Sequence, residues 1–115
     1  MQMDSFPEGY RALVIGASGG IGAALVEVLR SDPRCASVTE LARSTTPPLD
    51  LADSTSIEQA ATEVAGQGPF HLVINAAGVL HSAAFMPEKR LADLDYQQLL
   101  ETFQVNTFGP ALLLT

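Results

Sequence analysis

The feature that most constrains this chain is a glycine-rich run of seven residues, 16–22, that reads Gly-Ala-Ser-Gly-Gly-Ile-Gly. It follows an apolar stretch, Ala12 to Ile15, and opens a segment with helical periodicity. This order predicts a strand, a glycine turn and a helix. Glycine lets the chain reverse sharply and leaves its N–H groups without a neighbouring Cβ. The turn therefore predicts either an anion site at the helix N-terminus or a tight turn that binds no ligand.

The segment after the glycines has the pattern of an amphipathic helix. Ser31-Asp32-Pro33 predicts its end, because the residue before a proline avoids the α region. A second apolar run, Val38 to Ala42, predicts the next strand and completes a strand–helix–strand unit. The apolar spacing predicts one stripe on the helix that faces the sheet: Ile21, Ala24, Leu25, Val28 and Leu29.

Two further helices and a further strand are predicted downstream. Thr55 to Glu58 fits a capping box, so a helix is expected from about Thr55. Phe70 to Asn75 predicts a strand, 81–94 a loop, and 95 onward a helix. The inner face of the first of these helices is expected at Ile57, Ala60, Ala61 and Val64, and glycines at 66 and 68 end it.

The connection between Arg43 and Leu49 is too short for a helix between parallel strands, which takes a dozen residues or more. Leu49 to Leu51 should therefore either form a rudimentary third strand or follow the sheet edge without a helix. We expect at least three parallel strands with helices on both faces.

Charge and composition exclude several classes of partner. Six basic residues against 13 acidic ones give a net charge of −7, without the basic stripe that nucleic acid or an anionic membrane requires. Cys35 is the single cysteine, and His71 and His81 lack metal-ligand spacing, so neither a disulfide nor a metal site is expected. Residues 1–9 lack the pattern of a secretion signal, and no apolar run is long enough to span a bilayer. A cytoplasmic protein is expected.

Three motifs in the right order resemble those of the short-chain dehydrogenase/reductases. Gly16, Gly20 and Gly22 match the family's GxxxGxG. Residues 75–78, Asn-Ala-Ala-Gly, are similar to its Asn-Asn-Ala-Gly motif, and Asn106 in Val-Asn-Thr-Phe-Gly stands where the family has a structural and catalytic asparagine. The loop from Pro87 to Leu91 and the short connection after Arg43 resemble the C-factor-type subgroup.

The resemblance implies an α/β fold, a Rossmann-type doubly wound parallel sheet. Residues 1–115 would be the N-terminal, dinucleotide-binding half of a single domain, truncated after the fourth strand and part of the following helix. Complete members continue to a catalytic serine and a Tyr-x-x-x-Lys motif. The residues four places after Tyr10 and Tyr96 are Val14 and Leu100, so this motif is absent here. The chain alone is therefore expected to be inactive.

Cofactor preference depends on the end of the second strand. An NAD site places an acidic residue about 20 residues after the glycines; Ala42 stands there, followed by Arg43. A guanidinium suits a 2′-phosphate and stacks on adenine, which favours NADP(H). NAD(H) remains open, because a shifted register would bring Glu40 closer, Gly19 stands where many NADP-using relatives carry arginine, and Arg43 could simply be solvated.

The candidate cofactor residues come from four segments of the chain. Asp50 is similar to the family's aspartate that contacts the adenine amino group; a turn-forming aspartate before a helix is the alternative. The Asn75 turn would line the adenosine ribose, or its small residues would merely permit close packing. The full candidate set is Gly16, Ser18, Gly19, Gly20, Ile21, Gly22, Arg43, Asp50, Asn75, Ala76, Ala77 and Gly78.

Asn106 is the candidate catalytic residue. Pro110 has no N–H, so it cannot bond to the carbonyl of residue 106, and a kink is expected there. In the family, the corresponding carbonyl holds a water that links the catalytic lysine to solvent. The alternative is a kinked core helix without such a water.

The predicted function is the cofactor-binding half of an oxidoreductase that transfers a hydride between nicotinamide and a small-molecule carbonyl or alcohol. A homo-oligomer is a further expectation. Two alternatives stay open: an extended-type epimerase or dehydratase, because Gly16, Gly19 and Gly22 also fit that spacing, and a non-catalytic nucleotide-binding or interaction module.

Overall fold

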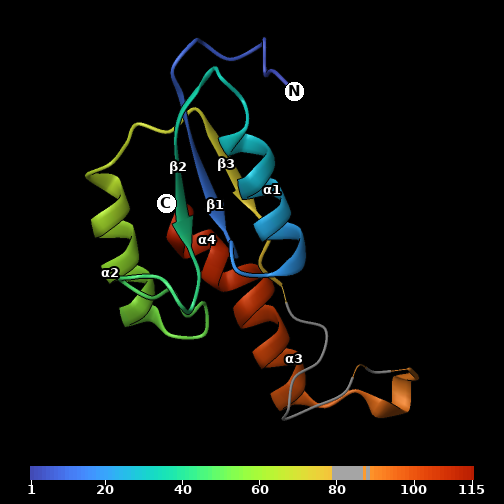
Figure 1. Cartoon of the computed structure of the whole chain (residues 1–115). Helices are drawn as coiled ribbons and strands as arrows, with labels where there is room; N and C mark the ends of the chain where they lie inside the picture. The colour runs from blue at the N-terminus through green and yellow to red at the C-terminus, as the bar shows by residue number, and fades with distance from the viewer. Residues whose placement is uncertain (79–86, 88) are drawn as a thin grey trace.

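The computed structural model describes residues 1–78, 87 and 89–115. Within them, β1 (Tyr10–Ile15) is the central strand of a parallel sheet. It pairs with β2 (Cys35–Leu41) on one side and with β3 (Leu72–Asn75) on the other, in the order β2-β1-β3 (Figure 1). The expectation of at least three parallel strands is confirmed.

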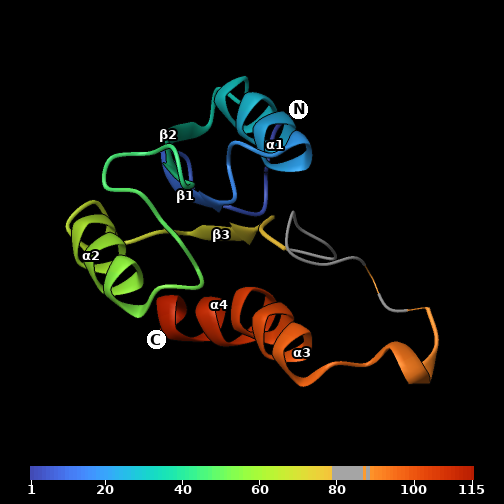
Figure 2. The same ribbon diagram turned by 90° about the horizontal axis from the view of Figure 1, so that it is seen from below.

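Helices cover both faces of this sheet, as expected. Figure 2 shows α1 (Gly20–Arg30) on one face and α2 (Ser54–Ala65) with α4 (Gly109–Leu114) on the other. A short 3-10 turn, η1 (Leu91–Asp93), precedes α3. The last helical stretch runs continuously through α3 (Tyr96–Phe103), the π-helical turn η2 (Gln104–Phe108) and α4.

The alternation of β1 side chains builds two cores, because successive residues of a strand point to opposite faces. Tyr10, Ala12 and Val14 pack with α1. Leu13 and Ile15 pack with the inner faces of α2 and α4. The expected inner face of α2 is confirmed, with Ile57, Ala60 and Val64 buried and Ala61 packed against them.

The predicted inner stripe of α1 is confirmed at Leu29, which is buried, and Leu25 is half-buried, but the rest of the stripe is displaced by part of a turn. The buried residues are Gly22, Val26 and Leu29, whereas Ile21 is 75% exposed and Val28 is 42% exposed; Ala24 is also exposed. The cause is the helix entry, because α1 approaches the strand end most closely at Gly22. Val26 and Leu29, which follow Gly22 by four and seven positions, then face the sheet.

The start of α2 also differs from the prediction. Asp53, not Thr55, is the N-cap, and its carboxylate accepts a hydrogen bond from the Thr55 N–H at 3.0 Å. Ser56 is buried, and its hydroxyl bonds to the main chain of the preceding segment. It donates to the Pro48 carbonyl and accepts from the Asp50 N–H. No capping box forms between Thr55 and Glu58.

The segment from Leu49 to Leu51 forms neither a strand nor a helix. It follows the sheet edge, where the Leu49 N–H donates to the Ala42 carbonyl at 2.9 Å. Because this segment forms no strand, the strand that was predicted as the fourth is β3, the third strand of the described residues. Residues 79–86 and 88, including His81 and half of the predicted 81–94 loop, lie outside the described residues. No described helix is long and apolar enough to cross a bilayer.

A buried carboxylate ties the N-terminal segment to the sheet. Asp32 is only 2% exposed and accepts hydrogen bonds from the Tyr10 hydroxyl at 2.7 Å, the Met3 N–H at 3.0 Å and the Arg34 N–H at 3.0 Å. Burial would raise the pKa of Asp32, but the N–H of Arg34, the Tyr10 hydroxyl and the Met3 N–H together hold it below its usual value. The same burial, together with the hydrogen bond to Asp32, raises the pKa of Tyr10.

We expect Asp32→Asn to be less stable than the unmodified chain at neutral pH and less sensitive to acid. A carboxylate with a lowered folded-state pKa stabilises the fold above the unfolded value of about 4, and this contribution disappears as the pH falls through the folded pKa. Urea midpoints measured between pH 7 and pH 2 test this, with the exposed Asp4→Asn as control. If the urea midpoints of Asp32→Asn and of the unmodified chain fall in parallel as the pH is lowered, the stabilising role of the Asp32 carboxylate is contradicted.

Candidate functional site

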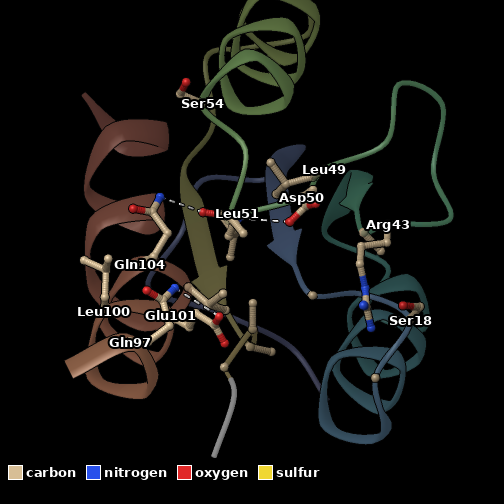
Figure 3. Close-up of a pocket in the computed structure, with 18 residues that line it drawn as sticks. Ser18, Arg43, Leu49, Asp50, Leu51, Ser54, Gln97, Leu100, Glu101 and Gln104 are labelled. Atoms are coloured by element: carbon tan, nitrogen blue, oxygen red, sulfur yellow. Dashed lines mark hydrogen bonds between the residues drawn. The ribbon is translucent and has the colours of Figure 1, made fainter. Parts of the chain in front are cut away.

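A cleft of about 850 Å³ opens where the glycine turn, the end of β2 and the turn after β3 meet (Figure 3). This is the carboxyl edge of the parallel sheet, where ligands of open α/β folds bind. Its fourth wall is the α3–η2 helix. The lining residues are Gly16, Ser18, Gly19, Ala42, Arg43, Leu49, Asp50, Leu51, Ala52, Ser54, Ala76, Ala77, Gly78, Gln97, Leu100, Glu101, Gln104 and Val105.

Two glycines of the turn are required by the protein itself. Gly16 has a positive φ of 79°, and a Cβ there would lie 2.7 Å from the Ala77 nitrogen. A Cβ on Gly22 would collide with the Gly16 carbonyl oxygen. The main chain of β1, α1 and the turn after β3 can meet only because these side chains are missing.

Gly19 and Gly20 have no such steric reason to be glycine. A Cβ at Gly19 would find its nearest neighbour at 3.6 Å, which is ordinary contact, and a Cβ at Gly20 would meet nothing within 4 Å. Gly19 is the N-cap of α1, and no side chain caps this helix, whereas Asp53 and Asp95 cap α2 and α3. Within the described residues, the first N–H groups of α1 are thus left to solvent or a ligand.

The predicted residues of the glycine motif divide into two groups. Ser18 and Gly19 line the cleft together with Gly16. The next three, Gly20, Ile21 and Gly22, form the first turn of α1 and do not line it.

Arg43 lies in the cleft wall at the end of β2, and its exposed side chain extends toward Ser18 (Figure 3). Glu40 pairs with Val14 in the strand register and lies outside the lining. Its carboxylate accepts a 2.6 Å hydrogen bond from the Arg30 guanidinium. The register that would bring Glu40 to the cleft is therefore not the observed one, and Ala42 lines the cleft at the end of β2.

Asp50 makes the turn before α2 and also lies in the cleft wall. Its carboxylate accepts from the Ala52 N–H at 2.9 Å, and its carbonyl accepts from the Asp53 N–H at 3.0 Å, which makes the turn before α2. The residue also lines the cleft. The turn role is thus present in the structure, and among the described residues it leaves the second carboxylate oxygen available at the cleft.

The turn after β3 lies directly beside the glycine turn. The Asn75 side chain accepts from the Ala77 N–H at 3.1 Å, and the Ala76 N–H donates to the Ile15 carbonyl at 2.8 Å. Ala76, Ala77 and Gly78 line the cleft, whereas Asn75 does not. Asn75 holds the shape of the turn, and the small residues form its surface.

Asn106 lies in η2, next to this turn. A Cβ on Gly78 would be 3.5 Å from the Asn106 Oδ1, so the side chain faces Gly78 although it does not line the cleft. The expected disruption by Pro110 takes the form of a π turn, in which the Gly109 N–H donates to the Gln104 carbonyl. The added residue places Pro110 in the first turn of α4, where no N–H is needed.

The α3–η2 wall was missed by the sequence predictions. Gln97, Leu100, Glu101, Gln104 and Val105 project into the cleft from one face. Their spacing at i, i+3, i+4, i+7 and i+8 is a helical stripe, and it ends one residue before Asn106. This stripe could have been found by extending the helix backward from Asn106. No three potential metal ligands gather anywhere in the described part of the chain.

Comparison with known proteins gives the fold. No family model and no curated protein matches the chain. Among solved structures, Sniffer of Caenorhabditis elegans, a protein named as a carbonyl reductase, is 25% identical with a TM-score of 0.71 over 94% of this chain and 51% of that one. A short-chain dehydrogenase of Burkholderia cenocepacia in complex with NADP is also 25% identical, with a TM-score of 0.67 over 92% of this chain and 44% of that one.

A third solved structure, an ElxO variant with NADPH bound, is 17% identical with a TM-score of 0.69 over 92% of this chain and 48% of that one. The chain thus spans about half the length of the solved structures it matches. Its neighbours are short-chain dehydrogenases and reductases, and the chain has the Rossmann-like α/β fold of their corresponding half.

Proposed function

We propose that these residues are the N-terminal, cofactor-binding half of an NADP(H)-dependent short-chain oxidoreductase. The observation that carries the proposal is the convergence of the uncapped α1 N-terminus, Arg43, Asp50 and the Ala76–Gly78 turn on one cleft. It lies at the carboxyl edge of a parallel sheet, the usual place for a dinucleotide. Two of the similar solved structures contain NADP or NADPH, which adds support.

The pyrophosphate would lie at the start of α1. The orphan N–H groups and the helix dipole favour a negative charge there. Protein packing does not require glycine at position 20, and the missing Cβ there would leave room for phosphate oxygens at the start of α1. Ser18 lines the same corner and would donate its hydroxyl to a phosphate oxygen.

The preference for NADP(H) over NAD(H) would come from Arg43. Within the described residues, Arg43 forms no ion pair, whereas Glu40 is already paired with Arg30. A guanidinium in the cleft wall without a nearby carboxylate partner suits a 2′-phosphate. The small side chain of Ala42 leaves that phosphate room, and Asp50 would contact the adenine amino group.

The complete enzyme would transfer a hydride between nicotinamide and a small-molecule carbonyl or alcohol carbon. Asn106 would support the proton path from its position against Gly78, as the resemblance implies. Both Asn106 and the turn after β3 favour the classical type of the family over the extended epimerase type. We place the enzyme in the cytoplasm and expect it to form a homo-oligomer.

We expect the 115-residue chain to bind NADPH and to oxidise none of it in the presence of carbonyl substrates. It contains no Tyr-x-x-x-Lys pair to donate the proton. Calorimetric titration gives the binding, and NADPH absorbance gives the turnover. Measurable turnover by a sample of the mass of this chain would contradict the assignment of the catalytic acid to residues beyond it.

We expect Arg43→Leu to weaken NADPH binding by roughly 10- to 100-fold, the equivalent of about 1.5–3 kcal/mol for hydrogen bonds to a charged group. NADH binding should fall less, because NADH lacks the 2′-phosphate and loses only the stacking of the guanidinium on adenine. Arg90→Leu is the matched control, since the Arg90 side chain is 77% exposed and pairs with Asp93 away from the cleft. Equal losses for NADPH and NADH, or none, would argue against NADP(H) preference.

Gly20→Ala and Gly22→Ala should have opposite effects. Alanine at Gly20 meets open space and should leave the urea midpoint unchanged or slightly higher, while NADPH binding falls by about tenfold or more. Alanine at Gly22 collides with the Gly16 carbonyl and should cost about 1–3 kcal/mol of stability. A folded Gly20→Ala variant that binds NADPH with full affinity would show that the pyrophosphate does not lie at the start of α1.

A further inference from the structure

The irregular segment that carries Asp50 is held by a side chain from a distant helix. The Gln104 amide nitrogen donates to the Leu51 carbonyl at 3.1 Å, across 53 residues of sequence (Figure 3). One turn further, a Cβ on Gly109 would lie 2.5 Å from the same carbonyl oxygen and 2.9 Å from the Leu51 Cβ. The helix therefore approaches Leu51 through a glycine and contacts it through Gln104.

This contact is needed because the segment has no ladder of its own. It forms no strand, and the Leu49 N–H to Ala42 carbonyl bond ties it to the end of β2. Leu51 itself is 7% exposed, so an unpaired carbonyl at this depth would be costly. Gln104 supplies the hydrogen bond that a neighbouring strand would otherwise supply.

Asp50 is thus held from two sides. Ser56, on α2, accepts from the Asp50 N–H at 2.7 Å, and Gln104, on η2, holds the carbonyl of the next residue. The Asp50 carboxylate also accepts from the Ala52 N–H, so the position of the main chain sets the position of the carboxylate. Movement of the Leu51 carbonyl would displace Asp50 from the cleft wall.

We propose that Gln104 is a positioning residue for the base-binding end of the cleft: it fixes the Leu51 carbonyl and thereby the Asp50 carboxylate. The proposal rests on the proposed function for the identity of the ligand. Gln97 offers a natural comparison, because it lines the same cleft from the same helix. Its amide donates to Glu101, one turn along its own helix, and not to the Leu49–Leu51 segment.

The test compares Gln104→Leu with Gln97→Leu in the intact chain. Amide hydrogen exchange without ligand reports on the segment through the Ala52 and Asp53 N–H groups, which bond to Asp50. We expect both amides to exchange several-fold faster in Gln104→Leu and NADPH binding to weaken about five- to tenfold. Gln97→Leu should leave the exchange rates unchanged. The nearly isosteric Gln104→Glu, whose carboxylate cannot donate, should reproduce both effects if Gln104→Leu fails to fold.

The exchange rates and the NADPH affinity together separate positioning of Asp50 from direct contact with the ligand. Unchanged exchange with weakened NADPH binding would mean that Gln104 contacts the ligand directly and would overturn the inference. Unchanged exchange and unchanged binding would overturn it while leaving the proposed function intact. If the unmodified chain binds no NADPH, the proposed function fails and the nucleotide role of Gln104 fails with it. The exchange rates then decide only whether Gln104 holds Leu51.

Discussion

The structure depends on the close meeting of three main-chain segments at the end of β1. Gly16 lies against the Ala77 backbone, and Gly22 at the start of α1 lies against the Gly16 carbonyl. No side chain fits in either contact, so α1 and the turn after β3 are both brought to the same strand end. The rotation of α1 about its own axis follows from this contact. With Gly22 held against β1, the residues that face the sheet are Val26 and Leu29. The cleft is the space that this meeting leaves at the carboxyl edge of the sheet.

The other side of the cleft is built differently, from irregular chain held by side chains. Between β2 and α2 the chain has no regular structure, yet Leu49 and Leu51 are part of the core beneath α2 and α4. The Ser56 hydroxyl and the Gln104 amide satisfy main-chain groups there that a strand pairing would have satisfied. This arrangement makes Asp50 both a turn residue and a cleft residue, so these two roles of Asp50 are compatible. It also ties the cleft to the last helix, which carries Asn106 beside Gly78.

Local patterns in the sequence predicted the order of helices and strands well, but they predicted less well which side of each helix is buried. The strand–turn–helix order, the inner face of α2 and the small-residue turn after β3 were all predictable, because each depends on neighbours in sequence. The stripe of α1 was not, because two apolar faces compete on that helix and only the Gly22 contact selects one. The N-cap of α2 is Asp53 and not Thr55, because the Asp53 carboxylate accepts a hydrogen bond from the Thr55 N–H.

By itself, the sequence determined the α/β class, the glycine turn that opens α1 and the absence of an acidic residue at Ala42, because these are properties of residue type and spacing. The tertiary structure alone decided that Glu40 is paired with Arg30 while Arg43 reaches the cleft, since that depends on the register of β2 against β1. It also decided that the α3–η2 helix closes the cleft and that Gln104 meets Leu51. The spacing of the helical stripe was visible in the sequence, but its contact with Leu51, 53 residues away from Gln104, was not, because only the packing of the helix on the sheet brings these residues together.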